Sequence, residues 1–173
     1  MFAGAFSAGK SMLINALLGR ELLYSAEGHA TGTECQIAYA EPAQERVVLT
    51  FLSELEVQNQ VQVLGDKLGM DSMDAKKAGM LLQDPALMSS LRDRCTAIIQ
   101  QEGGESKSEK AKQASAFKLL LQGFTDNQKY IDKTTNRTLS MEQFDFKNLQ
   151  EAASYSTSGC HEVHFLISNL LTD

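Results

Sequence analysis

The chain has few of the features that mark secreted, membrane-spanning or nucleic-acid-binding proteins. Its three cysteines, Cys35, Cys95 and Cys160, are widely spaced and form no CxxC pair, so they indicate no disulfide framework. No apolar run approaches membrane-spanning length, and no signal-peptide pattern is found. The net charge is −6 and basic residues do not cluster, which argues against a general nucleic-acid surface. We therefore expect a cytoplasmic protein without a nucleic-acid partner, whose membrane contact, if any, is peripheral.

The most specific feature that is present is a phosphate-binding loop. The run Gly4-Ala5-Phe6-Ser7-Ala8-Gly9-Lys10-Ser11 fits the pattern G-x-x-x-x-G-K-S. Glycines allow the tight turn that points backbone N–H groups at the phosphates of a nucleotide, the lysine reaches the β- and γ-phosphates, and the serine hydroxyl binds Mg²⁺. The pattern predicts a nucleotide site; the alternative is a chance match in a stretch rich in glycine and alanine.

The residues after this loop favour the nucleotide site. Met12, Leu13, Ala16 and Leu17 recur with helical spacing, and Gly19 is a helix-stop signal. A helix that begins near Lys10 directs its positive end at bound phosphate.

Other parts of a nucleotide-binding domain are missing from the sequence. Only three residues precede Gly4, so the strand that normally places a P-loop is a stub or lost. There is no apolar strand that ends in Asp-x-x-Gly and no Asn-Lys-x-Asp motif for guanine; the tetrad Asp66-Lys67-Leu68-Gly69 fits the first pattern but lies at the end of an amphipathic helical pattern. We expect a chain that is cut at both ends.

Three zones follow from the pattern of the whole sequence: a nucleotide-binding front at 1–52, a helical insertion at 53–158, and a strand at 159–173 that returns to the sheet. The expected fold class is α/β, a partial P-loop sheet with a large helical insertion or subdomain. Segments 36–40 and 46–52 read as strands, and their short connector with Pro42 predicts an antiparallel hairpin. With a strand at 161–167 they should form a small, largely antiparallel sheet, to which Phe2 and Ala3 add a short pairing.

Helices are predicted at 53–68, 84–101 and 107–122, with one more at 145–155. The first has a capping-box pattern from Ser53 to Glu56, and the second has Asp84 as N-cap before Pro85. Gly123 is expected to end the third helix. Because the apolar stripes of these helices can bury one another, we expect them to pack as a separate subdomain.

The residues Gly4 to Gly19 resemble the first motif of the bacterial dynamin-like GTPases, which carry G-x-F-S-[AS]-G-K-S and then a helix with I-N-A-L-L-G. The segment Ala30-Thr31-Gly32-Thr33 takes the place of the threonine-containing switch of that family. The resemblance covers the front third of the chain well and the end moderately. It implies a parent protein that binds GTP and Mg²⁺, hydrolyses GTP, self-associates and remodels membranes, with a cytoplasmic location peripheral to a membrane.

The resemblance also implies roles for single residues. Ser7 and Thr31 would take part in catalysis, and Ser11 and Thr31 would bind Mg²⁺. The nucleotide would be bound by the loop and the first helical turn: Gly4, Ser7, Ala8, Gly9, Lys10, Ser11 and Met12. Eukaryotic dynamins have Gln where this chain has Phe6, so no side chain that orients water is present there. Because motifs for Mg²⁺ and guanine are missing, hydrolysis by the isolated chain should be weak or absent.

Several alternatives remain open. Thr33 is the second candidate for the switch threonine, and a solvated loop residue is the favoured interpretation of His29. The run Cys160-His161-Glu162-Val163-His164 suggests a metal, but strand geometry puts the two histidines on opposite faces. For the whole chain, the alternatives are a non-catalytic helical interaction module with a vestigial P-loop, or part of a P-loop ATPase.

Overall fold

A computed structural model describes residues 9–19, 34–70, 73–142 and 160–167 of the chain. The described residues form a mixed α/β fold with two compact units. The sheet unit lies within residues 1–51 and 137–173, and the helical unit comprises residues 52–136. The α/β class with a helical subdomain, as predicted from the sequence, is confirmed.

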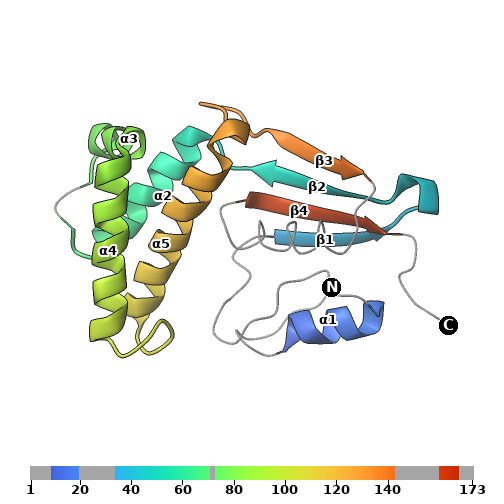
Figure 1. Cartoon of the computed structure of the whole chain (residues 1–173), viewed down its shortest axis with the longest axis horizontal. Helices are drawn as coiled ribbons and strands as arrows, with labels where there is room; N and C mark the ends of the chain where they lie inside the picture. Colours follow the sequence, from blue (N-terminus) through green and yellow to red (C-terminus); the bar gives the residue numbers. More distant parts are fainter. Residues whose placement is uncertain (1–8, 20–33, 71–72, 143–159, 168–173) are drawn as a thin grey trace. The chain divides into compact units, whose positions relative to one another are not determined.

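The sheet unit contains four described strands: β1 (Glu34–Tyr39), β2 (Arg46–Phe51), β3 (Thr138–Glu142) and β4 (Cys160–Ile167). Their order across the sheet is β1-β4-β2-β3 (Figure 1). β4 is parallel to β1 and antiparallel to β2, and β2 is antiparallel to β3. Alternate residues of β2 are buried, and Val47 lies opposite the fully buried Phe165 of β4. The period of two therefore gives this sheet one buried face.

The hairpin predicted for 36–40 and 46–52 is wrong. β1 and β2 do not pair with each other, because β4 lies between them and pairs with both. Their connector forms a short 3-10 helix, η1 (Pro42–Gln44), in place of a tight hairpin turn. An interior position satisfies the backbone groups of β4 along both edges, which suits an apolar strand. The described sheet is consequently mixed, with one parallel and two antiparallel pairings.

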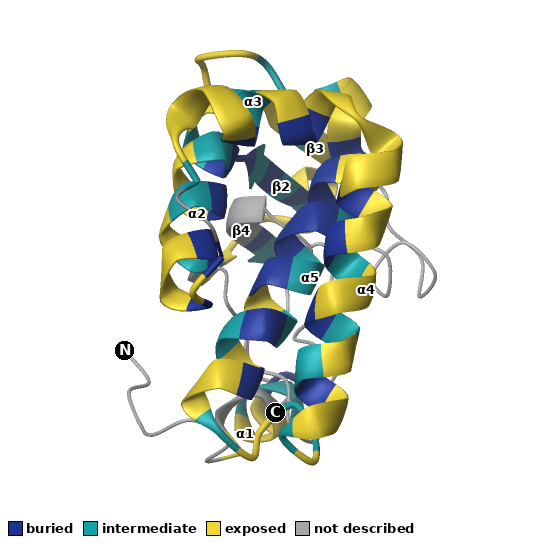
Figure 2. Ribbon diagram, turned by 90° about the vertical axis from the view of Figure 1, so that its left-hand side faces the viewer, coloured by how far each residue is buried: buried dark blue, intermediate teal, exposed yellow. Residues whose placement is uncertain are grey.

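The helical unit is built from α2 (Glu54–Lys67), α3 (Ala75–Gln83), α4 (Pro85–Gln101) and α5 (Glu109–Asn127), followed by the short 3-10 helix η2 (Gln128–Tyr130). Figure 2 shows buried residues along the facing sides of α2, α4 and α5. These residues belong to a single hydrophobic cluster, in which Val61, Cys95, Phe117 and Leu121 are fully buried. The apolar stripes seen in the sequence thus bury one another.

The predicted caps Ser53 and Asp84 are confirmed as the starts of two helices. Ser53 and Glu56 form a reciprocal capping box at α2, with the backbone N–H of Ser53 donating to the Glu56 carboxylate at 2.8 Å. Asp84 accepts from the N–H groups of Ala86 and Leu87 at the start of α4, where Pro85 is the first helical residue. Proline is tolerated there because its missing N–H would have no intrahelical partner.

The helical zone differs from the predicted 53–158. Its described part ends at residue 136, and the next residues form β3, a strand that the sequence analysis missed. α3 was not predicted as a separate helix. α5 continues to Asn127 although Gly123 was expected to end it, because Gly123 is buried and Phe124 extends the apolar face. The helix predicted at 145–155 and the pairing of Phe2 and Ala3 lie outside the described residues.

Candidate functional site

Gly9, which precedes the P-loop lysine, has a backbone conformation that other residues avoid. Gly9 has φ 72° and ψ 13°, in the left-handed region, and it is the N-cap of α1 (Lys10–Leu18). Its carbonyl oxygen accepts the first intrahelical hydrogen bond, from the N–H of Leu13 at 2.9 Å. Beyond its chain neighbours and the backbone of α1, no described heavy atom lies within 4 Å of a Cβ built on Gly9. The requirement for glycine is therefore conformational, and a helix begins at Lys10 as predicted.

The start of α1 differs from the starts of the other described α-helices. Each of those has a side-chain oxygen that accepts a hydrogen bond from a backbone N–H of the first turn; the caps are Ser53, Asp74, Asp84 and Ser108. α1 has a glycine at this position, and no acidic residue in its first turn. The positive end of the helix dipole is therefore not offset by a cap or a carboxylate of the helix itself. An external anion is favoured at such a position.

The other end of α1 is also as predicted. Gly19 is the C-cap, with φ 63°, and its N–H donates to the carbonyl oxygen of Ala16.

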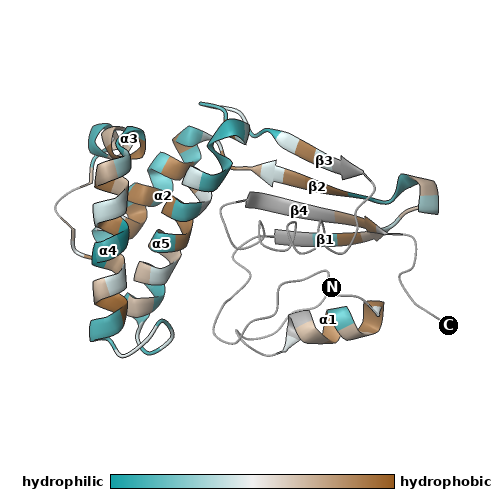
Figure 3. Ribbon diagram, in the orientation of Figure 1, coloured by the Kyte–Doolittle hydropathy of each residue, from teal (hydrophilic) through white to brown (hydrophobic). Residues whose placement is uncertain are grey.

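The apolar side chains of α1 differ in how far they are exposed to solvent. Met12, Leu13 and Leu17 are 66%, 53% and 46% exposed, whereas Leu18 is buried. Figure 3 shows the hydrophobic residues along α1. The apolar stripe noted in the sequence is thus largely exposed in the described structure.

The structure places only part of the predicted site. Gly9 is the N-cap, and Lys10, Ser11 and Met12 are the first three residues of α1. This is the order that puts the P-loop lysine and serine in the first turn of a phosphate-facing helix. The remaining predicted site residues, Gly4, Ser7, Ala8 and Thr31, lie outside the described residues, as do His29 and Thr33, so their roles stay predictions.

The tetrad Asp66-Lys67-Leu68-Gly69 was set aside as a Mg²⁺ motif, and its structure supports that choice. Asp66 and Lys67 are the last residues of α2, and Leu68 is its C-cap. Gly69 has φ 66° and donates its N–H to the carbonyl oxygen of Asp66, while the N–H of Met70 donates to that of Gly65. This is the usual termination of a helix at glycine, which leaves no strand end from which Asp66 can project.

The two histidines of the last strand were considered as metal ligands. His161 and His164 both belong to β4 and are three positions apart. Among the described residues, no group of three or more His, Cys, Asp or Glu side chains is arranged to hold a metal ion. The segment forms the strand β4, as the sequence predicts, and the role of its histidines stays a prediction.

Cys95 is a thiol of the helical core. It lies on α4 and is fully buried in the hydrophobic cluster. Burial raises its pKa from 9.0 to about 11, and the positive charges of Arg94 and Lys118 offset only part of that rise. At neutral pH the group is a protonated thiol, and it therefore has the character of a packing residue and not of a nucleophile.

The helices of the described part of the chain are too short or too polar to cross a membrane. The mixed sheet, the helix that follows the G-x-x-x-x-G-K-S loop and the left-handed Gly9 together define a protein of the P-loop α/β class. The sequence profile of the Dynamin family matches residues 1–163, which is nearly the whole chain. The chain therefore belongs to the dynamin family. A search of curated proteins found no match.

Proposed function

We propose that this chain binds GTP together with Mg²⁺ through its P-loop, as part of the GTPase domain of a dynamin-like protein. The observation that carries the proposal is Gly9, held in the left-handed region at the uncapped start of α1 inside a complete G-x-x-x-x-G-K-S motif. A first turn without an acidic residue, which starts at a glycine, suits phosphate, and membership of the dynamin family supports guanine as the base.

The proposed roles follow from the position of each residue. Lys10, at the first position of α1, supplies a positive charge for the β- and γ-phosphates. Ser11, at the second position, supplies a hydroxyl oxygen, which is the kind of ligand that Mg²⁺ prefers. Ser7 beside the β–γ bridge and Thr31 as the switch threonine are carried over from the resemblance. When bound, the metal ion would neutralise charge on the phosphate oxygens.

We further propose that hydrolysis by this chain alone is weak. Within its 173 residues there is no apolar strand that ends in Asp-x-x-Gly, and no Asn-Lys-x-Asp motif for guanine. Phosphoryl transfer depends mainly on positioning and on charge stabilisation, so missing groups reduce the rate more than they reduce binding. Remodelling of membranes, self-association and a cytoplasmic location at a membrane surface are proposals for the parent protein, supported by its family.

A fluorescent GTP analogue titrated in Mg²⁺ buffer tests the proposal. Lys10→Ala should weaken binding by a factor of about ten or more, because one charge-assisted contact to phosphate is lost. Ser11→Ala should weaken binding in Mg²⁺ but not in EDTA. Lys110→Ala, at an exposed position of α5, is the matched control and should bind as the unaltered chain does.

Competition with unlabelled nucleotides tests the base. GTP should displace the analogue better than ATP, and the reverse order would favour the ATPase alternative. Equal affinity of the unaltered chain and Lys10→Ala would contradict a functional P-loop and would favour the non-catalytic helical module.

A further inference from the structure

The first turn of α2 is connected to a segment about 80 residues further along the chain. Normally the first N–H groups of a helix are satisfied by local caps or by water. At α2 the N–H of Glu54 donates to the carbonyl oxygen of Asp132 at 2.8 Å, and the N–H of Leu55 donates to that of Lys133 at 3.1 Å. The segment 131–136, at the end of the helical unit, therefore supplies hydrogen-bond acceptors to the first N–H groups of α2, at its beginning. It is called the outgoing segment below.

Glu56 joins the two segments through its side chain. One carboxylate oxygen, Oε2, accepts from the backbone N–H and the hydroxyl of Ser53, both at 2.8 Å. The same oxygen accepts from the side-chain amide of Asn136, also at 2.8 Å. Hydrogen bonds to an ionised acceptor are stronger than bonds between neutral groups. The capping box of α2 is thus also a tie to the outgoing segment.

The outgoing segment has its own anchors. Ile131 packs against the hydrophobic cluster of the helical unit. Next to it, Asp132 accepts from the N–H groups of Thr134 and Thr135 through Oδ1, which turns the chain so that Asn136 faces Glu56. Beyond Ile131 the segment has little buried apolar surface, since residues 133–136 are all exposed. Its attachment to α2 therefore depends on polar contacts.

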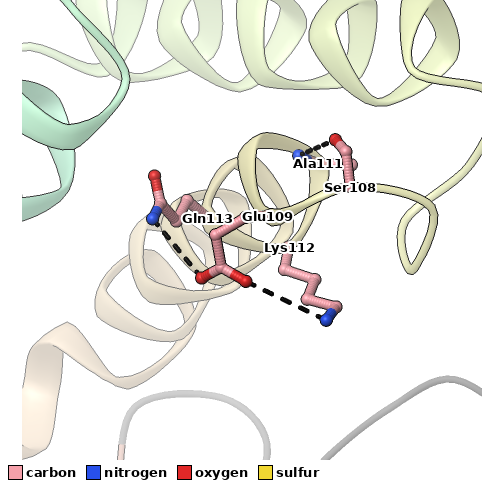
Figure 4. A network of polar contacts seen from close by, with 5 residues as sticks. All are labelled: Ser108, Glu109, Ala111, Lys112 and Gln113. Atoms are coloured by element: carbon pink, nitrogen blue, oxygen red, sulfur yellow. Dashed lines mark hydrogen bonds and ion pairs between the residues drawn. The ribbon is translucent and has the colours of Figure 1, made fainter.

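The start of α5 provides a comparison, because its polar contacts are all with nearby residues of the same helix start. Ser108 caps the N–H of Ala111, while Glu109 contacts Lys112 and Gln113 of the same helix (Figure 4). Every contact in that network is between residues no more than four positions apart. Both helices have acidic residues in the first turn, but the contacts of Glu109 are local whereas Glu56 accepts from Asn136 of a distant segment.

We propose that Ser53–Glu56 and 131–136 form a clasp, which fastens the two ends of the helical unit together. The carboxylate of Glu56 holds the clasp closed by accepting from both segments. The clasp opens locally while the hydrophobic core of the unit stays folded. The polar contacts of the clasp and the apolar contacts of the core are made by different residues, apart from the anchor Ile131, so the two can be lost separately. While the clasp is closed, the first and last residues of the helical unit are held next to each other.

Limited trypsin digestion of the full chain measures this opening. Cleavage after Lys133 requires the clasp to open, because its carbonyl oxygen accepts from Leu55; cleavage after Arg94 and Lys118, on α4 and α5, requires the core to unfold. Asn136→Ala should raise cleavage after Lys133 about tenfold, the factor expected when one bond to a charged group is lost. Asn136→Asp should raise it further, since it places a second carboxylate beside Glu56.

The control is Glu109→Gln, which removes the equivalent charge at α5 and should leave cleavage after Lys133 unchanged. An unchanged rate after Lys133 in Asn136→Ala would overturn the proposal. A parallel rise after Arg94 and Lys118 would also overturn it, because opening would then be part of global unfolding. A smaller effect of Asn136→Asp than of Asn136→Ala would exclude Glu56 as the partner that matters.

Discussion

The two units of the molecule use helix starts in opposite ways. In the helical unit every described α-helix has a side-chain cap, so the polar ends are satisfied by the protein and the apolar faces share one core. In the sheet unit α1 begins at a left-handed glycine without a cap, and three of its large apolar side chains are about half exposed or more. A helix start that stabilises the fold is satisfied internally, whereas one that binds an anion must be left open to it.

The largest effect should come from the helical core. Phe117 is fully buried in the cluster, and Phe117→Ala should lower the free energy of unfolding of the helical unit by about 3–5 kcal/mol, through lost burial and the cavity left behind. Urea denaturation followed by circular dichroism measures the change. Leu87→Ala, at a side chain that is 48% exposed, is the control and should cost far less. Similar losses in both variants would mean that the cluster is not the stabilising core.

An intermediate effect is expected at the open helix start, and it rests on the proposed function. Gly9→Ala forces a residue with a Cβ into the left-handed region, which costs about 1–2 kcal/mol, equivalent to roughly tenfold in the affinity for a GTP analogue. Gly19→Ala imposes the same conformational cost at the other end of α1, away from the P-loop. It should weaken binding less than Gly9→Ala. Equal losses would show that the integrity of α1, and not the geometry of its start, controls binding.

A last effect, which shows only at alkaline pH, concerns the buried thiol. The pKa of Cys95 is raised to about 11 in the folded chain, so between about pH 9 and 11 the folded state keeps a proton that the unfolded state has lost. The free energy of unfolding should therefore fall as the pH rises through this window. Cys95→Ala is less stable at neutral pH but should show a shallower decline. Parallel pH profiles for the two proteins would contradict a buried, protonated thiol.

Sequence reasoning succeeded where structure is determined locally. The capping residues Ser53 and Asp84, and Gly19 at the end of α1, act within a few positions of the bonds that they make. It failed where the partner is distant: β4, which separates β1 from β2, lies more than 100 residues beyond them in the sequence. Gly123 is a stop signal in isolation, but burial of Phe124 extends α5 past it.

The candidate site was predictable to a similar degree. The motif pattern was sufficient to predict a helix that begins at Lys10 after a glycine. Ser7 and Thr31 were assigned only by resemblance, and they lie outside the described residues. The tie between Glu56 and Asn136 was missed because an exposed asparagine near the end of a polar segment has no distinguishing pattern in the sequence.

The strand order has a consequence for synthesis of the protein. β4 is the last of the four strands to be made, yet it lies between β1 and β2, so the ladder that links these two strands cannot form until residues 160–167 have been translated. The helical unit, complete by residue 136, depends on no later residue for its hydrophobic cluster. On the ribosome the helical unit should therefore fold first, while the edge of β1 that pairs with β4 is still unpaired, the stage at which a nascent chain is most prone to aggregate.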